Sequence, residues 1–159
     1  MSKPLEPGDQ APDFDLPSDD GGPIRLADLK GRTVVLYFYP KDDTTGCTNE
    51  AKAFTAAAAD FAKAGAVVVG VSKDTVASHG RFRSKHDLEL RLGSAADNDT
   101  VERYGGWVQK SLYGRQYMGI DRSTFLIDGS GTIRRIWRKV KVPGHVDEVL
   151  AAARELAAN

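Results

Sequence analysis

Apolar residues in the first half of the chain gather in two runs, 34–39 and 66–72, that are apolar at nearly every position. Runs of this kind are typical of strands covered on both faces. Between them lies an alanine-rich stretch, 46–64, in which Ala51, Phe54, Ala58 and Phe61 recur at steps of three and four. This spacing predicts one helix with a buried stripe, ended by Gly65.

The rest of the chain contains shorter patterns that predict two hairpins, three further helices and one further strand. Alternation at 14–16 and 24–26 around turn residues predicts an N-terminal hairpin, and the flanks of Gly129-Ser130-Gly131 predict a second one at 124–137. Helical patterns occur at 75–86 and 145–156, with a short helix from 97 or 99 to 105 and a weak strand at 90–93. Residues 106–119 show no clear period, so we expect irregular structure there.

Two strand–helix–strand units followed by a hairpin and a last helix predict an α/β protein with a mixed central sheet flanked by helices on both faces. This order is similar to that of a thioredoxin-like fold preceded by an N-terminal β-hairpin. The 159 residues contain no repeat, long linker or low-complexity tract. We therefore expect a single domain over 1–159.

The charge balance and the cysteine count exclude several classes of function. Twenty-two basic and 22 acidic residues give a formal net charge of zero, so neither nucleic acid nor an anionic membrane is an expected partner. No stretch approaches the roughly 20 apolar residues of a membrane span, and the start of the chain lacks a secretory signal pattern. One cysteine cannot form an internal disulfide, which favours a reducing, cytoplasmic location.

That cysteine, Cys47, stands where the first predicted helix begins, four residues before Ala51 of its stripe. The thiol should therefore point inward, and the helix N-terminus favours its thiolate form. Thr44 adds a hydroxyl three residues earlier, and Pro40 ends the strand and shields the site. A free cysteine on an apolar stripe is also often a small buried hydrophobe, and position alone favours that interpretation.

The residues around Cys47 form a longer pattern. Pro40-x-x-x-Thr44-x-x-Cys47 lies within the stretch 37–48, and two further segments, 70–79 and 122–128, follow in order. In these motifs the sequence resembles the peroxiredoxins, and within them the bacterioferritin comigratory protein (PrxQ) subgroup. The resemblance extends from about Leu5 to the last helix.

The resemblance implies a thiol-dependent peroxidase of antioxidant defence, reducing hydrogen peroxide and organic hydroperoxides. Cys47 would attack the peroxide and become a sulfenic acid. Thr44 and the Gly46 and Cys47 backbone N–H groups would bind the substrate oxygens, and Arg122 would hold the thiolate. Glu50 matches a polar position beside the site, although a carboxylate is favourable in the first turn of any helix. Without the resemblance, Arg122 looks like an ordinary surface charge.

Two features depart from the subgroup pattern. Thr45 stands where proline is usual, and Lys52 and Arg83 occupy the two places where a resolving cysteine is found. The resemblance therefore implies a one-cysteine peroxiredoxin, natural or with its resolving cysteine replaced. An external thiol, such as thioredoxin, glutaredoxin or glutathione, would complete the cycle of a monomeric enzyme.

Two other classes of function remain open at this stage. The missing resolving cysteine fits a peroxide sensor or redox relay, and a buried Cys47 fits a non-catalytic thioredoxin-fold binding protein. No metal, haem or flavin is expected, because the histidines at 79, 86 and 145 lack metal-ligand spacing with Cys47 and are expected to be solvated or capping. Residues 106–119 are expected either to wall the peroxide pocket or to form a packed surface loop.

Overall fold

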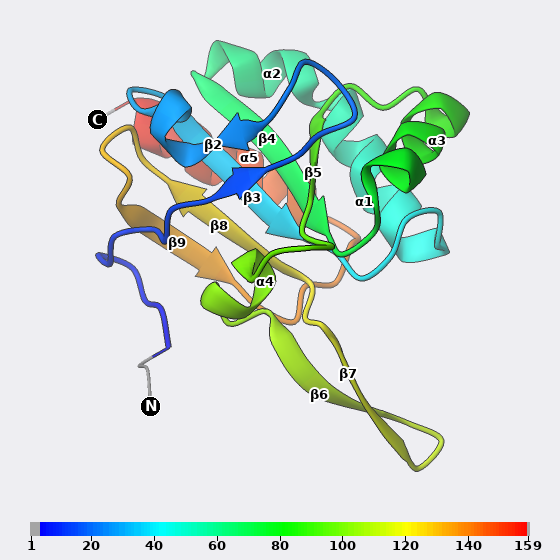
Figure 1. The fold of residues 1–159 in the computed structure, drawn as a ribbon. Helices are drawn as coiled ribbons and strands as arrows, with labels where there is room; N and C mark the ends of the chain where they lie inside the picture. The colour runs from blue at the N-terminus through cyan, green and yellow to red at the C-terminus, as the bar shows by residue number, and fades with distance from the viewer. Residues whose placement is uncertain (1–3, 159) are drawn as a thin grey trace.

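A computed structural model describes residues 4–158. Its centre is a five-stranded sheet in the order β5-β4-β3-β8-β9 (Figure 1). The strands are β3 (Thr33–Phe38), β4 (Ala66–Ser72), β5 (Arg91–Ser94), β8 (Ser123–Ile127) and β9 (Ile133–Trp137). β3, β4 and β5 run parallel to one another. On the other side of β3, β8 pairs antiparallel to β3, and β9 pairs antiparallel to β8. The mixed sheet predicted from the sequence is confirmed.

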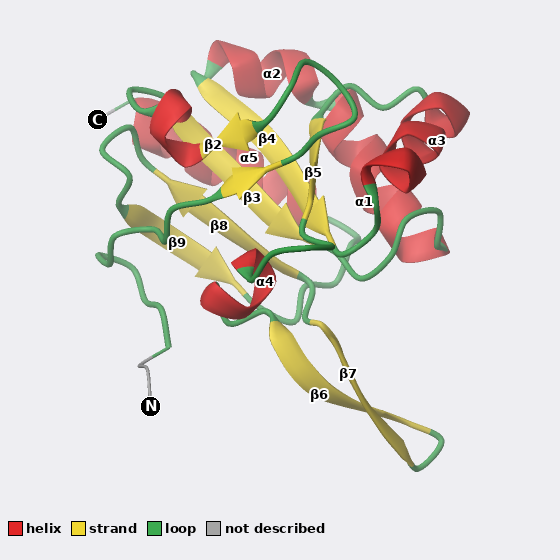
Figure 2. Cartoon of the chain, viewed as in Figure 1, coloured by secondary structure: helices red, strands yellow, loops and turns green. Residues whose placement is uncertain are grey.

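The central strand β3 is buried on both faces. Val35 and Tyr37 belong to one apolar layer, and Val34, Leu36 and Phe38 belong to the other. The first layer lies under α1 (Thr45–Ala56), α2 (Ala58–Lys63), α3 (Val76–His86) and α5 (His145–Ala157). The second is covered by the β1–β2 hairpin (Asp15–Leu16 and Ile24–Arg25), the short helix η1 (Leu26–Leu29) and α4 (Thr100–Arg103), as Figure 2 shows.

The helix expected at 46–64 is in fact two helices, α1 and α2, separated at Ala57. Both segments are rich in alanine, the strongest helix former, so nothing local encodes the break. α2 packs against β4 and α5, and this tertiary packing overrides the preference for a straight helix. Gly65, with φ +73°, follows the end of α2 as predicted. At the break, Ala57 packs against the core cluster beneath the helices, and Ala57 and Ala58 are both half-buried.

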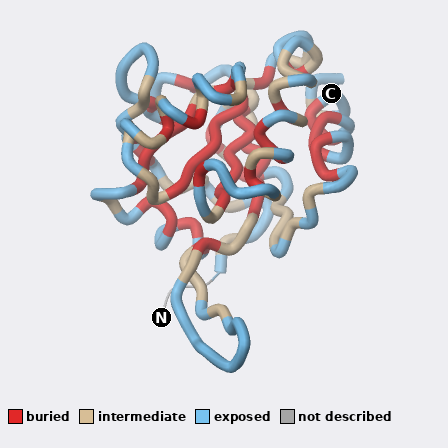
Figure 3. Tube along the Cα trace, turned by 90° about the vertical axis from the view of Figure 1, so that its right-hand side faces the viewer, coloured by how far each residue is buried: buried red, intermediate tan, exposed pale blue. Residues whose placement is uncertain are grey.

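Residues 106–119 were expected to be irregular, but they contain most of a further hairpin, between β5 and β8 in chain order. β6 (Trp107–Leu112) and β7 (Arg115–Ile120) pair in antiparallel register and project from the body of the molecule (Figures 1 and 3). Tyr113 and Gly114 both have positive φ, the geometry of a two-residue type I′ turn. The outer half of this hairpin is exposed on both faces, so its strands carry no apolar period. This outer half does not pack on the body as a surface loop would, whereas Trp107 and Ile120 at the base of the hairpin pack against the second apolar layer.

The remaining elements follow the sequence pattern closely. α3 begins at Thr75, whose hydroxyl oxygen accepts a hydrogen bond from the Ser78 N–H. Over residues 4–158, no helix is long and apolar enough to cross a lipid bilayer.

Candidate active site

Cys47 lies in the first turn of α1, directly after the loop that leaves the carboxyl end of β3. Its side chain is 1% exposed and packs in the layer between the sheet and the helices. The thiol therefore points inward, as its position on the helical stripe predicts. It is the sole sulfhydryl group of the chain.

Arg122 reaches Cys47 from a distant part of the chain. The antiparallel register of β3 and β8 pairs Phe38 with Ser123, which places the start of β8 beside the loop leading to α1. From there the Arg122 Nη2 donates to the Cys47 Sγ over 3.4 Å. The contact places a positive charge and an N–H donor directly against the sulfur.

Gly46 provides the room for this contact. A Cβ atom on Gly46 would lie 3.2 Å from the Arg122 Nη2, closer than ordinary van der Waals packing allows. The guanidinium therefore rests against the bare backbone of the first turn of α1.

Glu50, one turn after Cys47, is completely buried. Its Oε1 accepts a hydrogen bond from the Arg122 Nη1 over 2.6 Å, whereas its Oε2 has no partner among the described residues. Burial raises the pKa of Glu50 to about 7, although Arg122 acts in the opposite direction. Burial also disfavours the Arg122 cation, but Glu50 and Cys47 outweigh it and raise the pKa of Arg122.

Tyr37 is a neighbour of the site that the sequence did not reveal. Its hydroxyl is buried without a partner in the described part of the chain, and its ring stacks on Phe54 of α1 at 4.6 Å. Burial raises the pKa of Tyr37, and the nearby Glu50 and Cys47 raise it further. The phenol thus stays neutral beside the ion pair. In the sequence it stood out only as a member of the apolar run 34–39 and as the first residue of the motif stretch 37–48.

The loop residues Pro40 and Thr44 lie nearer the surface than Cys47. The Thr44 hydroxyl donates to the Lys41 carbonyl over 2.9 Å, so in this arrangement it meets an incoming group as an acceptor. The first helical hydrogen bond of α1 runs from the Thr48 N–H to the Thr44 carbonyl. The N–H groups of Thr45, Gly46 and Cys47 consequently have no acceptor within the helix and can donate to an oxygen bound at its N-terminus.

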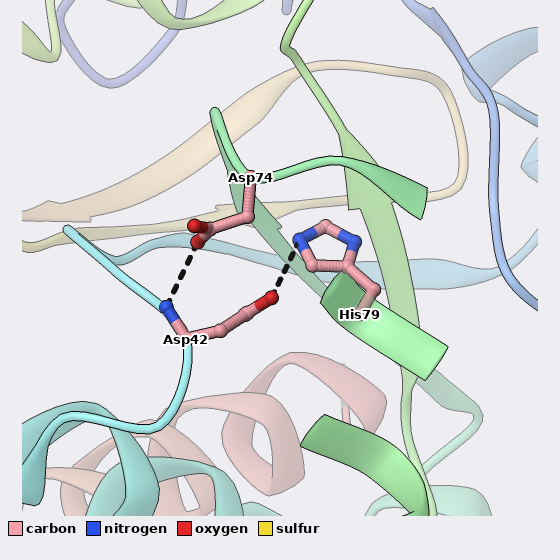
Figure 4. A group of neighbouring side chains, drawn as sticks. All are labelled: Asp42, Asp74 and His79. Atoms are coloured by element: carbon pink, nitrogen blue, oxygen red, sulfur yellow. Dashed lines mark hydrogen bonds and ion pairs between the residues drawn. The ribbon is translucent and has the colours of Figure 1, made fainter. Parts of the chain in front are cut away.

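Asp42 anchors the same loop in a buried polar network (Figure 4). Its N–H donates to the Asp74 Oδ2 over 2.8 Å, and its carboxylate accepts from the Tyr39 and Ser78 hydroxyls at 2.5 and 2.7 Å. The His79 Nε2 lies 3.7 Å from the Asp42 Oδ2. Burial raises the pKa of Asp42 and lowers that of His79.

The expectation of solvated or capping histidines is wrong for His79 and His145, which are 0% and 3% exposed. Each shares a hydrogen bond with an inward-facing hydroxyl, from Ser72 at 2.9 Å and from Thr124 at 2.8 Å. These partners come from β4 and β8, so only the fold brings them to the histidines.

The carboxylates of Asp42 and Asp74 and the ring of His79 are close enough to share a cation, with ligand atoms within 4.8 Å of one another. The oxygens involved already accept hydrogen bonds from hydroxyl and backbone donors, including Ser72 to Asp74 at 2.7 Å. The group therefore fits a hydrogen-bonded network better than a metal site.

Both positions expected for a resolving cysteine lie in structured helices. Lys52 is exposed on α1. Arg83, on α3, donates two hydrogen bonds to the Asp19 carboxylate, from Nε over 2.6 Å and from Nη2 over 3.2 Å. Its Nη1 donates to the Leu88 carbonyl. Arg83 thus links α3 to the loop after β1 and to the segment after α3, and neither Lys52 nor Arg83 supplies a second sulfur.

Comparison with known proteins adds an independent finding. Residues 7–136 match the AhpC/TSA family. The chain is 51% identical to the putative peroxiredoxin bcp of Coxiella burnetii, covering 92% of this chain and 97% of that protein. It is 44% identical to peroxiredoxin Bcp of Bacillus subtilis, covering 96% and 98%.

Solved structures give the same picture. The bacterioferritin comigratory protein of Xanthomonas campestris, described with respect to alkyl peroxide reduction, has a TM-score of 0.86 at 42% identity and covers 91% of this chain and 92% of its own. A variant of PrxQ from Xylella fastidiosa has a TM-score of 0.91 at 35% identity, covering 98% and 99%.

Proposed function

The chain belongs to the AhpC/TSA family as a peroxiredoxin of the Bcp (PrxQ) type, and from this premise we propose that Cys47 is the nucleophile of its peroxidase reaction. The protein is a thiol-dependent peroxidase that uses a peroxide and a thiol reductant. The observation that carries the proposal is the buried Cys47 sulfur held 3.4 Å from the Arg122 Nη2, at the N-terminus of α1.

In the first half of the reaction, the Cys47 thiolate attacks one oxygen of the peroxide. A sulfur–oxygen bond forms and the O–O bond breaks, so the sulfur is oxidised by two electrons to a sulfenic acid. The other oxygen leaves as an alkoxide or hydroxide and takes up a proton, giving alcohol or water. Arg122 and the free N–H groups of Gly46 and Cys47 stabilise the charge on these oxygens, and Thr44 accepts a hydrogen bond from the peroxide hydroxyl. Pro40 covers the approach.

Glu50 has a supporting role in this proposal. Its carboxyl group holds the second nitrogen of Arg122, at 2.6 Å, and so fixes the plane of the guanidinium. Arg122 then presents one nitrogen to Glu50 and the other to Cys47.

The second half of the reaction needs a thiol from outside the chain, because Lys52 and Arg83 stand where a resolving cysteine would be. An external thiol attacks the sulfenic sulfur, forms a mixed disulfide and expels water. A second thiol then attacks this disulfide and releases the Cys47 thiolate. Glutathione or a protein dithiol of the thioredoxin or glutaredoxin class fits this role.

Peroxide consumption by the wild type, Cys47→Ser and Arg122→Gln tests the proposal. With a supplied thiol, Cys47→Ser should be inactive, and Arg122→Gln should lose about 100- to 1,000-fold in the rate of Cys47 oxidation. Intact mass after one equivalent of peroxide should show one added oxygen in the wild type and none in Cys47→Ser. Equal peroxide consumption by wild type and Cys47→Ser would overturn the proposal.

The single cysteine also favours a second candidate, a peroxide sensor or relay that passes its oxidation to a partner protein. The relay predicts rapid oxidation of Cys47 in a single turnover but negligible turnover with every common thiol. Turnover with several thiols in parallel separates the two. We further propose that the protein acts in the reducing environment of the cytoplasm. We also propose that it is a monomer, which light scattering tests.

A further inference from the structure

The β6–β7 hairpin is an element that the proposed reaction does not use. It projects from the body of the molecule, and only its base packs against the second apolar layer (Figures 1 and 3). The large hydrophobic side chains that are exposed within residues 4–158 all lie in its outer half: Leu112, Tyr113, Tyr117 and Met118. Exposed apolar side chains gathered on one projecting element mark an interaction surface.

The turn at the tip of the hairpin has the same character. Tyr113 has φ +51° and is 97% exposed. A bulky residue is uncommon in this conformation, which asparagine or glycine adopts at lower cost. Packing within the chain does not explain the tyrosine, because its ring lies in solvent. A contact with another molecule gives the ring a role.

One face of the hairpin combines positive charge with apolar groups. Cross-strand partners share a face, and successive pairs alternate between the two faces. Lys110 pairs with Tyr117, and Leu112 pairs with Arg115 two positions further along, so all four lie on the same face. A Cβ on Gly119 would lie 3.3 Å from the Lys110 Cδ and 3.4 Å from the Tyr117 Cε2, so both side chains lie over this glycine. We call this surface the cationic face.

The opposite face of the outer hairpin carries no charge. It presents the pairs Gln109–Met118 and Ser111–Gln116. The Gln109 side-chain amide donates to the Gln116 Oε1, so these polar groups partly satisfy each other. A partner that recognises charge would therefore bind the cationic face.

The charges of the cationic face are available to a partner. Neither Lys110 nor Arg115 forms an ion pair with a residue in the described part of the chain. Over residues 107–122 the one acidic residue is Asp121, beyond the base of the hairpin. Such a surface is complementary to one that carries carboxylates around an apolar centre.

The hairpin also adjoins the candidate active site. β7 ends two residues before Arg122, which holds the Cys47 sulfur. The Val140 N–H donates to the Arg122 carbonyl over 2.9 Å. This bond brings Lys139 and Lys141 to the same place, and both are exposed and lack an ion pair within residues 4–158. A protein with acidic groups that docks on the hairpin would thus lie beside the site.

We propose that the cationic face of the β6–β7 hairpin is the docking surface for the protein that supplies the external thiol, a protein dithiol with carboxylates and apolar groups around its reactive cysteine. The identity of this partner rests on the proposed function. A second copy of this chain fits the surface less well, because a two-fold contact would set Lys110 and Arg115 against the same cations.

Turnover with a protein reductant and with a small one tests the inference. Bacterial thioredoxin and glutaredoxin are the protein probes, and dithiothreitol is a small neutral thiol that needs no docking surface. Tyr117→Ser alters the cationic face. Met118→Ser is the matched control, because Met118 is 49% exposed against 47% for Tyr117 but lies on the opposite face. We expect Tyr117→Ser to lower kcat/KM for the better protein reductant about tenfold, through KM, and Met118→Ser to change it less than about twofold.

The double variant Lys110→Glu/Arg115→Glu tests the charge. It should lower kcat/KM for the protein reductant about 10- to 100-fold and abolish the fall that the wild type shows between about 0.05 and 0.5 M salt. Turnover with dithiothreitol, and oxidation of Cys47 by peroxide, should stay within about twofold of wild type in all three variants, because solvent and salt screen exposed charges.

Equal losses in Tyr117→Ser and Met118→Ser would overturn the inference, as would a loss that dithiothreitol shares. Turnover with dithiothreitol but with neither protein reductant would also overturn it and leave the peroxidase function intact. Failure of the peroxidase function would be seen separately, as the absence of Cys47 oxidation by peroxide. Wild-type dimers that Tyr117→Ser dissociates would assign the surface to a second copy instead, and co-sedimentation with phosphatidylglycerol vesicles would assign it to a bilayer.

Discussion

At the level of single residues, the site depends on which atoms are absent as well as on which are present. Gly46 has no side chain, and the Arg122 guanidinium occupies the space where a Cβ would stand. The same arginine divides its nitrogens between Cys47 and Glu50. Displacement of this one group would weaken both contacts.

Gly46→Ala should therefore lower activity without lowering stability. Alanine is the better helix former by about 1 kcal/mol, but its methyl group would push the guanidinium away by a few tenths of an ångström. We expect the rate of Cys47 oxidation by peroxide to fall about tenfold, with an unchanged or higher urea midpoint. An unchanged oxidation rate would show that the position of Arg122 is not limiting.

Among elements, a glycine of β4 lets a side chain of the neighbouring β3 lie directly against the β4 backbone. Tyr37 and Gly70 are paired in the parallel register, and a Cβ on Gly70 would lie 2.7 Å from the Tyr37 Cζ. The ring cannot easily move, because it is fully buried and stacks on Phe54 of α1. The glycine in β4 thus lets the helix carrying Cys47 settle onto the sheet.

Gly70→Ala should destabilise the fold by about 1–3 kcal/mol, the usual cost of overpacking a core. Gly80→Ala in α3 provides the matched control, because its Cβ would meet nothing nearer than the Asp19 Cβ at 3.9 Å. A glycine-to-alanine change in an open helix position should instead stabilise by about 0.5–1 kcal/mol. Urea denaturation measures both, and equal effects of the two changes would contradict this account.

For the molecule as a whole, the two apolar layers share one sheet, so we propose that residues 1–159 form a single domain that unfolds in one transition. The buried Glu50 then links the stability of the entire fold to pH. Its pKa is about 7 in the folded protein against an ordinary value of 4.5. Between these values the folded state binds more protons than the unfolded state, so stability falls as the pH rises.

This linkage predicts how Glu50→Gln should behave. The free energy of unfolding of the wild type, measured relative to that of Glu50→Gln, should fall by up to about 3 kcal/mol between about pH 4.5 and 7 and then level off. Urea denaturation at several pH values, followed by tryptophan fluorescence and circular dichroism, gives both quantities. A pH-independent difference would show that Glu50 titrates normally, and non-coincident transitions would contradict the single domain.

The sequence by itself determined the order of the central-sheet strands, their two-sided burial and the inward direction of Cys47, and its local motifs carried the resemblance to the family. These features are local, since periodicity and turn residues express how each segment meets the core. It misjudged the break at Ala57, the hairpin at 107–120 and the burial of His79 and His145. In each case the deciding contacts, or their absence, lie outside the segment.

Only the tertiary structure decided which distant side chains meet. Arg122 reaches Cys47 through the register of β8 on β3, Glu50 becomes a buried partner of that arginine, and α3 holds the loop at Asp42 and Asp43. No spacing in a sequence encodes such meetings, because they depend on how strands pair and helices pack across the sheet. The reactive environment of Cys47 is therefore a property of the fold, although the cysteine itself stands out in the sequence.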